Sequence, residues 1–444
     1  MDWVAFGLLL NDNTLLYAAI LAGSVILYYF IIRKIYLSIL DPIVFALGFS
    51  AFGFSVIWFL YFTGNIADKY LMSYLLTQAA FILGLFSFKS LRKDKIVAER
   101  KTITLQNEGL FLKLLFIVSS SIYIVAQLVS YKVIGVPLLL GNHVDIYNSS
   151  GGWGLLGRFI DVLKPVSAIT LIYFLFKKTS SLSFYIYKYA FLVLLLVFFA
   201  LSGSRSEFMT LGFILFCFIL LNGNELKRYF LNIGKFEITL ILAGLFFVFL
   251  TIIVQSQSDE GGFSSLNILM FRLVSSGDTY YFAYPNGNIE HLNSTKPFLA
   301  LFGDIFSTVR LIPRANQPEP LGFQLYKLFY DSDVTAGPNA RHNVFGYVYF
   351  GFYGSIIYSY LLGFLLSLVR NKLFFNLRKN SLLQILFILL YLNLSGLEAD
   401  APSAFSNLEN ILLILPFPVI LTLVLFIALT KSHKEIVPDN IIPI

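Results

Sequence analysis

The stretch from residue 337 to residue 364 places two chemically active side chains directly before a long apolar run. It reads GPNARHNVFGYVYFGFYGSIIYSYLLGF and contains Arg341 and His342. A guanidinium is permanently charged and its rigid fork of donors suits a phosphate or pyrophosphate. An imidazole can take up a proton near neutral pH and act as a general base. The pair therefore predicts a catalytic site at a membrane–water boundary, although a histidine that only hydrogen-bonds a loop carbonyl is the alternative.

The residues around this pair predict how it is presented. Gly337 and Pro338 favour a turn, and either Asn339 or Asn343 is expected to cap the helix that follows. A helix N-terminus itself attracts an anion, so Asn343 also becomes a candidate for substrate binding.

A second candidate is Arg205, in the segment LSGSRSEF at 201–208, which joins two apolar runs with almost no room for a loop. Its small neighbours leave the guanidinium accessible to a phosphate, and we count it with the catalytic candidates. A local ion pair with Glu207, or a side chain that reaches to the membrane interface, would explain the residue equally well.

Weaker candidates for substrate binding lie in a long polar segment. Arg272 is expected on one amphipathic helix, and Arg310 and Arg314 near the end of another. Asp278 lies among tyrosines in SSGDTYYFAY, a composition that suits a sugar or an interfacial aromatic belt.

Two more carboxylates, Glu398 and Asp400, occupy the short turn SGLEADAP. They could orient an acceptor hydroxyl or a histidine, but a solvated turn explains them at least as well. Asp331 and Asp333 have a spacing that can hold a divalent ion, which is a weak signal. The four histidines are scattered and Cys217 is the single cysteine, so we expect no metal site and no cofactor.

The elements that position these residues are membrane helices. The chain has 444 residues, of which 57% are hydrophobic and 13% charged, and its mean hydropathy is +0.77. Soluble domains carry about 25% charged residues, so the composition predicts an all-α polytopic membrane protein. The net charge of +7 comes mostly from short loops between apolar runs, which argues against nucleic-acid binding.

Apolar runs of roughly 20 residues predict about eleven (11–12) transmembrane helices. The expected spans are 13–32, 43–62, 70–88, 109–130, 163–176, 184–201, 207–222, 237–255, 346–369, 381–396 and 409–430.

The distribution of Lys and Arg predicts the orientation, with the N-terminus outside and the C-terminus in the cytoplasm. Residues 1–444 form one expected membrane domain with two long outer loops, at 131–162 and 256–345. The second loop is too long to lack structure, and its apolar spacing predicts amphipathic helices over 263–284 and 297–311.

Several segments resemble those of the bacterial O-antigen polymerase (Wzy) family, the oligosaccharide repeat-unit polymerases. The segment at 201–208 resembles the family's small-residue and arginine segment at the outer end of a span. The loop at 256–345 resembles its large periplasmic loop, and RHNVFGYVYFGFYGSIIYSYLLG at 341–363 resembles the return into the membrane. The first outer loop, with LLLGNHVDIYNSSGGWG, is also similar. Members often have twelve or more spans, which is at least one more than the eleven expected here.

The resemblance implies a glycosyltransferase-C-like bundle in the bacterial inner membrane, with its active site on the periplasmic face. The donor would be a glycan on undecaprenyl pyrophosphate, and the acceptor a single lipid-linked repeat unit. Transfer would invert the anomeric carbon without a metal, and a chain-length regulator protein is a possible partner beside membrane lipids. The family's loop arginines would correspond to Arg205, Arg272, Arg310, Arg314 and Arg341, of which only Arg205 and Arg341 lie in matching motifs.

Three other functions compete with polymerisation. An O-antigen ligase would use the same donor with a different acceptor, and the sequence layout barely separates the two. A lipid-linked oligosaccharide flippase would place charges within its spans, whereas most of these spans carry none. A structural scaffold would need neither the long outer loop nor the Arg–His pair. The sequence contains no Walker or GxGxxG motif, which disfavours ATP-driven transport.

Overall fold

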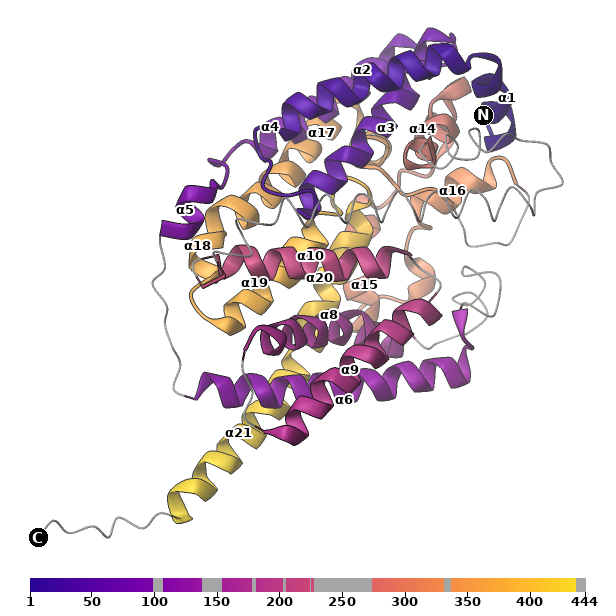
Figure 1. The fold of residues 1–444 in the computed structure, drawn as a ribbon. Helices are drawn as coiled ribbons and strands as arrows, with labels where there is room; N and C mark the ends of the chain where they lie inside the picture. Colours follow the sequence, from indigo (N-terminus) through magenta and orange to yellow (C-terminus); the bar gives the residue numbers. More distant parts are fainter. Residues whose placement is uncertain are drawn as a thin grey trace, which may run out of the picture. The chain divides into compact units, whose positions relative to one another are not determined.

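The structure is a computed structural model that describes residues 1–98, 107–137, 154–177, 181–202, 205–223, 225–226, 274–330 and 337–436. Every regular element within these residues is a helix (Figure 1). Seven of the helical segments are long and apolar enough to cross a membrane. The described part of the chain, with helices as its regular elements and these candidate spans, confirms the expected class of polytopic membrane protein.

The chain divides into two compact units. Unit 1 comprises residues 1–99, 219–374 and 390–406, and unit 2 comprises residues 100–218, 375–389 and 407–444. The division falls within α10 (Arg205–Leu221), α18 (Phe374–Leu377), α19 (Ser381–Leu394) and α20 (Ala401–Ile414).

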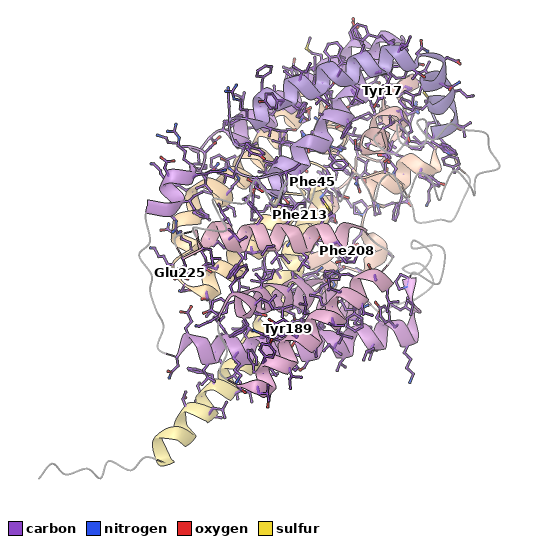
Figure 2. All side chains as sticks on the ribbon, viewed as in Figure 1. Tyr17, Phe45, Tyr189, Phe208, Phe213 and Glu225 are labelled. Carbon is purple, nitrogen blue, oxygen red and sulfur yellow. The ribbon has the colours of Figure 1, made fainter. Side chains whose placement is uncertain are left out.

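Unit 1 holds the N-terminal helices, the described part of the long loop and the segment with Arg341 and His342. Its helices are α1 (Trp3–Asp12), α2 (Thr14–Ile32), α3 (Pro42–Phe62), α4 (Asp68–Leu85), α5 (Lys93–Ala98), η2 (Ser275–Gly277), α14 (Asp278–Ala283), η3 (Pro285–His291), α15 (Pro297–Thr308), η4 (Arg314–Asn316), α16 (Leu321–Lys327), α17 (His342–Ser367) and η5 (Leu368–Leu373). Aromatic rings fill much of its core. Tyr17 of α2, labelled in Figure 2, packs edge-on against Phe59 of α3 at 5.4 Å between ring centroids.

Unit 2 is built around α6 (Glu108–Val133), α8 (Gly154–Phe176), α9 (Leu182–Leu201) and α21 (Pro416–Ile436). The ring of Phe116 on α6 lies within 6.0 Å, between centroids, of both Phe174 on α8 and Phe191 on α9. The ammonium of Lys188 is buried and donates to the carbonyl oxygen of Phe174 at 3.1 Å. Since a buried charge needs such a partner, this bond fixes α9 against α8.

Helix α17 is bent back on itself at Gly351. This glycine has φ 69° and ψ −175°, outside the helical region. His342 Nδ1 lies 2.9 Å from Ser359 Oγ, although 17 residues of straight helix would separate them by about 25 Å. The ring of Phe345 also stacks on that of Tyr358, at 5.7 Å between centroids. Helix α17 is therefore a hairpin with a first arm at 342–350 and a second arm at 352–367, which we call the α17 hairpin.

The hairpin corrects the expectation of one straight span at 346–369. A nine-residue arm covers about 13 Å and cannot cross a hydrocarbon core of about 30 Å. The remaining part of the helical stretch His342–Leu377 is long enough to do so.

Most of the other expected spans correspond to helices of the structure. Six of them are matched by candidate spans at 14–33, 42–62, 108–133, 154–176, 182–201 and 401–430. The run at 70–88 corresponds to α4, an 18-residue helix that is not among the seven. The runs at 207–222 and 381–396 are shorter apolar helices. The span expected at 237–255 lies outside the described residues.

The long outer loop is helical where the structure describes it. Helix α15, Pro297–Thr308, confirms the amphipathic helix expected at 297–311. Of the helix expected at 263–284, residues 263–273 lie outside the described part, and the rest forms η2 and α14. Helix α8 begins at Gly154, so the end of the first expected loop, 131–162, belongs to a span.

Two glycines let α4 and the second arm of the α17 hairpin touch backbone to backbone. A Cβ atom on Gly84 would lie 2.2 Å from the carbonyl oxygen of Tyr360, and one on Gly363 would lie 2.1 Å from that of Phe81. Any larger residue at either position would force the two helices apart.

A buried ion pair lies at the other end of the same hairpin. The Arg370 Nη2 atom is 2.6 Å from Asp41 Oδ2, and neither residue is more than 1% exposed. Arg370 also donates to Tyr391 Oη, Asn371 Oδ1 and the carbonyl oxygen of Ile35. The expected span ended at residue 369, which is wrong because the helical structure continues through Leu368–Leu373 and buries Arg370.

Candidate functional site

Arg341 is buried and already paired. Its Nη1 atom lies 3.2 Å from Glu398 Oε1, and Nη2 donates to the carbonyl oxygen of Ser276. Arg341 is 5% exposed and Glu398 2%. The pKa of the Arg341 guanidinium is raised, because the Glu398 carboxylate and nearby tyrosines outweigh the cost of burial. Arg341 therefore joins the turn after α19 to η2 and does not present a free guanidinium.

His342 is enclosed within the hairpin. Its Nε2 atom lies 3.2 Å from Gln78 Oε1, its Nδ1 atom bonds Ser359, and its ring stacks on Phe81 at 5.0 Å between centroids. Since an amide oxygen can only accept, we place the imidazole hydrogen on Nε2, and the Ser359 hydroxyl donates to Nδ1. Both ring nitrogens are occupied and the residue is 0% exposed, so a substrate hydroxyl does not reach it in this arrangement.

Asn343 completes a buried triplet. Its Oδ1 atom accepts from Tyr280 Oη at 2.8 Å, and its Nδ2 atom donates to Thr77 Oγ1 at 2.8 Å. Helix α17 begins at His342 with Arg341 as its N-cap residue and no side-chain cap. Capping by Asn339 or Asn343 was therefore wrong for this helix, because Asn343 uses its amide to join α14 to α4.

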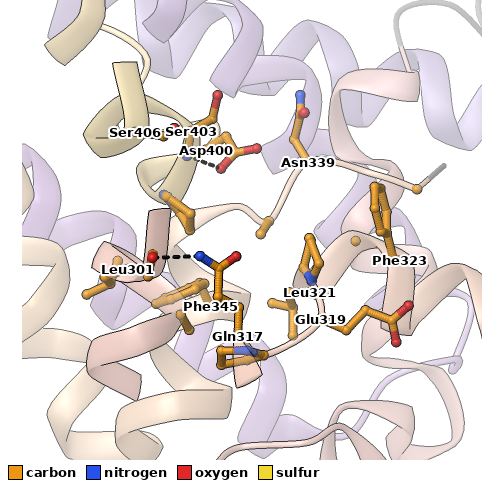
Figure 3. Close-up of a pocket in the computed structure, with 18 of the residues that line it drawn as sticks. Leu301, Gln317, Glu319, Leu321, Phe323, Asn339, Phe345, Asp400, Ser403 and Ser406 are labelled. Carbon is orange, nitrogen blue, oxygen red and sulfur yellow. Dashed lines mark hydrogen bonds between the residues drawn. The ribbon is translucent and has the colours of Figure 1, made fainter. Parts of the chain in front are cut away.

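A pocket lies beside this triplet, within unit 1 (Figure 3). Its volume is about 390 Å³, within the range of roughly 300–1,000 Å³ that is usual for small-molecule sites. The walls come from α15, the segments at 317–323 and 337–340, the first arm of the α17 hairpin, and the turn between α19 and α20. The pocket thus combines two segments that the sequence analysis selected separately, GPNARHN and SGLEADAP.

Two carboxylates on one side of the pocket are held by α20. Asp304 of α15 accepts from Ser406 Oγ at 2.6 Å, and Asp400 accepts from the backbone N–H of Ser403 at 3.0 Å. Asp400 therefore caps α20. Burial raises the pKa of the Asp400 carboxyl, and the Ser403 N–H partly offsets the effect.

The pocket is also lined by amides, a third carboxylate and aromatic rings. Gln317 donates from Nε2 to the carbonyl oxygen of Gly303 at 2.6 Å and to Ser307 Oγ at 2.7 Å. Glu319 pairs with the exposed Lys327 at 2.5 Å. Figure 3 shows the side chains of Gln317, Glu319 and Phe345 around the hollow. Such a mixture of hydrogen-bonding groups and rings suits a sugar.

Two glycines shape the pocket wall. A Cβ atom on Gly322 would lie 2.0 Å from the carbonyl oxygen of Pro338, and one on Gly337 would lie 2.1 Å from that of Gly322. The segments at 317–323 and 337–340 can therefore meet only because both positions lack a side chain. The structure assigns no turn at Gly337 and Pro338, so the expected turn is wrong and the glycine at 337 is needed for this close approach instead.

Asp278 begins α14 and does not line the pocket. Burial raises the pKa of its carboxyl to about 6, opposed by the Thr279 N–H and by Arg341. The neighbouring Tyr280, Tyr281 and Tyr284 are all buried, so they are core residues here and offer no platform for a sugar.

Arg310 is not among the described residues that line the pocket. Arg310 is exposed just after α15 and has φ 60°. Arg205 and Arg314 are the first residues of α10 and η4, and Arg272, Asp331 and Asp333 lie outside the described residues. Glu207, the suggested local partner of Arg205, pairs with Lys164 at 2.5 Å. Among the residues that the structure describes, no three His, Cys, Asp or Glu side chains form a possible metal site.

Sequence reasoning selected Asp400 but missed Asp304, Gln317 and Glu319. Asp304 left a signal, because it is the single acid within the apolar stripe PFLALFGDIFSTVRL at 297–311. Gln317 and Glu319 left none, since polar residues between two helices are unremarkable.

Comparison of the chain with protein-family models, with curated proteins and with solved structures finds no match. The architecture and the pocket define a polytopic helical membrane protein with a polar pocket in unit 1, and any function must be argued from that site.

Proposed function

We propose that the chain is a membrane glycosyltransferase that polymerises lipid-linked oligosaccharide repeat units. It would transfer the growing glycan from undecaprenyl pyrophosphate to a hydroxyl of a new lipid-linked unit. The enzyme would act at the periplasmic face of a bacterial inner membrane, with the N-terminus periplasmic and the C-terminus cytoplasmic. The resemblance of three sequence segments to repeat-unit polymerases motivates the proposal, and the pocket is the observation that carries it.

The pocket supports the proposal through its place and its lining. It is built from the long loop, the return into the α17 hairpin and the turn between α19 and α20, all next to membrane-type helices. Carboxylates, two amides and aromatic side chains line it, which are the groups that hydrogen-bond to sugar hydroxyls and stack on sugar rings. A flippase would instead need polar groups along its spans.

We assign the role of general base to Asp400, in place of His342. A base must reach the hydroxyl that it deprotonates, and Asp400 lines the pocket whereas His342 does not. A carboxylate with a raised pKa also accepts a proton more readily than an ordinary one. The acceptor oxygen would bond to the anomeric carbon, the bond from that carbon to pyrophosphate would break, and the hydroxyl proton would pass to Asp400.

The pyrophosphate would sit outside the pocket. Three acids line the pocket, and Arg341 is already paired with Glu398. Arg310, exposed just after α15, remains our candidate for contact with the leaving group, because α15 also supplies Asp304 to the pocket. Arg205, Arg272 and Arg314 remain candidates from the resemblance alone.

The test is polysaccharide banding from a deletion strain that carries the wild type, Asp400→Asn or Glu290→Gln. Asparagine caps a helix as well as aspartate, so Asp400→Asn should leave α20 intact while removing the base. Glu290 is a partly exposed acid of unit 1 that does not line the pocket, and its variant is the matched control.

The outcomes separate the candidate functions. Loss of the ladder in Asp400→Asn, with single repeats still attached to the lipid-A core, would support polymerisation. Loss of all attached repeats with accumulation of lipid-linked polymer would indicate an O-antigen ligase. A full ladder in Asp400→Asn would show that Asp400 and its pocket take no part in the reaction.

A further inference from the structure

The charge of the pocket restricts the sugars that it can hold. Its lining includes the carboxylates of Asp304, Glu319 and Asp400, and no lysine or arginine among the side chains that the structure describes there. Glu319 is 39% exposed and pairs with Lys327 at the surface, so its charge is partly compensated. The other two acids decide the charge of the pocket.

The groups that hold Asp304 and Asp400 are neutral. A serine hydroxyl donates to Asp304, and a backbone N–H donates to Asp400. Such bonds satisfy the carboxylate oxygens without cancelling their charge. Arg341 is a buried cation that directly follows the lining segment at 337–340, and its charge is already neutralised by Glu398. Among the side chains that the structure describes at the pocket, the two carboxylates therefore leave a net negative charge facing a ligand.

An anionic ligand would meet uncompensated repulsion in this pocket. Like charges brought together away from bulk water are unfavourable, and burial weakens the screening by salt that would relieve them at a surface. Hydroxyl groups meet no such cost, because they can donate to the carboxylates and accept from amides. An ammonium group would gain from the same field.

We propose that the pocket selects uncharged or amino-bearing sugars and rejects acidic ones such as uronic acids. The inference rests on the proposed function only in taking the ligand to be a glycan. It adds a specificity that the resemblance to repeat-unit polymerases does not supply.

The experiment measures binding of three tetrasaccharides to the purified full-length protein in detergent at low salt. All have the same β-1,4-linked hexose backbone and differ in charge: glucosamine, N-acetylglucosamine and glucuronic acid. We expect the glucuronic acid oligomer to bind at least tenfold more weakly than the neutral one, and the glucosamine oligomer to bind at least as tightly. In Asp304→Asn this difference should shrink several-fold, because the introduced amide oxygen can still accept from Ser406 but carries no charge.

Glu290→Gln is the control, because it also removes one negative charge from unit 1 but lies outside the pocket. Its preference should equal that of the wild type. Equal or tighter binding of the acidic oligomer overturns the inference, as does an unchanged preference in Asp304→Asn or binding of none of the three.

Failure of the inference is distinguishable from failure of the proposed function. If the ladder disappears in Asp400→Asn but the wild type shows no charge preference, the proposed polymerase function is supported and the proposed sugar specificity is overturned. If the charge preference shrinks in Asp304→Asn but the ladder stays full in Asp400→Asn, the pocket binds sugars selectively and the proposed polymerase function is overturned.

Discussion

The two ends of the α17 hairpin each carry a buried arginine, and the two arginines are held differently. Arg370 bonds a carboxylate, a phenol, an amide and a backbone carbonyl. Arg341 bonds one carboxylate and one carbonyl, and the segment before it lines the pocket. The sequence suggested catalysis at Arg341 and ended the expected span just before Arg370, yet both arginines form buried ion pairs. An arginine at the end of an apolar run therefore does not by itself mark a catalytic site.

The comparison predicts a larger loss of stability at Arg370 than at Arg341. In Arg370→Ala, the buried Asp41 carboxylate loses its charged partner, which costs about 3–5 kcal/mol. Thermal unfolding in detergent, followed by size-exclusion fluorescence, should show a protein that is largely unfolded or not recovered. Lys372→Ala is the control, because Lys372 lies in the same helical turn but is exposed, and it should change stability by no more than about 0.5 kcal/mol. If Arg370→Ala and Lys372→Ala unfold at the same temperature, the ion pair between Arg370 and Asp41 does not stabilise the fold.

At Arg341 the expected effect is smaller and partly reversible. Arg341→Ala leaves Glu398 buried and unpaired, at a cost of about 3 kcal/mol, whereas Arg341→Met with Glu398→Leu replaces the pair by apolar groups and should recover most of that loss. Thermal unfolding measures both.

The double variant also separates positioning from catalysis. If Arg341 only positions the pocket, the double variant should restore part of the polysaccharide ladder along with stability. If the double variant is stable but makes no ladder, Arg341 takes a direct part in catalysis.

His342→Ala tests whether the hairpin needs its internal hydrogen bonds. The change removes the bonds to Ser359 and Gln78 and should cost about 1–3 kcal/mol. The fraction that still folds should polymerise normally, measured as the ladder per amount of folded protein. A stable His342→Ala protein with no ladder would restore the general-base hypothesis.

The last expected effect is a dependence of stability on pH at Asp278. Its pKa is raised to about 6 from an ordinary value of 3.8, so between these values the folded state binds more protons than the unfolded state. Stability should therefore fall as pH rises through this window, by at most about 1.4 kcal/mol per unit. Asp278→Asn should unfold at a temperature that varies less between pH 4 and pH 7. An unchanged profile would show that another group titrates there.

Sequence patterns predicted the helical class well because apolar runs of membrane length have few alternative structures. The amphipathic helix α15 was equally predictable, since its apolar residues recur with a clear helical period. The reversal at Gly351 was not predictable, because it lies within a run of mostly apolar and aromatic residues and because glycine also occurs in close helix packing. Hydropathy counts residues along the chain and does not report a change of direction within them.

The candidate site was predictable only in part. The sequence selected the turn with Asp400 and the segment before His342, which do meet at the pocket. It assigned chemistry to Arg341 and His342 from residue type alone, whereas their partners Glu398, Ser359 and Gln78 are 57, 17 and 264 residues away in the chain. Whether a polar side chain is free or committed depends on such distant partners, and no local pattern encodes them.

Under the proposed function, the reversal at Gly351 would also set the depth at which a lipid-anchored substrate meets the pocket. His342 lies beside Ser359, seven residues along the second arm from its start at residue 352, so it is about 10 Å from the tip of the hairpin along that arm. The segment at 337–340, which ends just before this point, thus reaches the helices part of the way down the second arm rather than at its end. The first sugar of a glycan on an embedded lipid would then have to rise about 10 Å less to reach the pocket than to reach the tip of the hairpin.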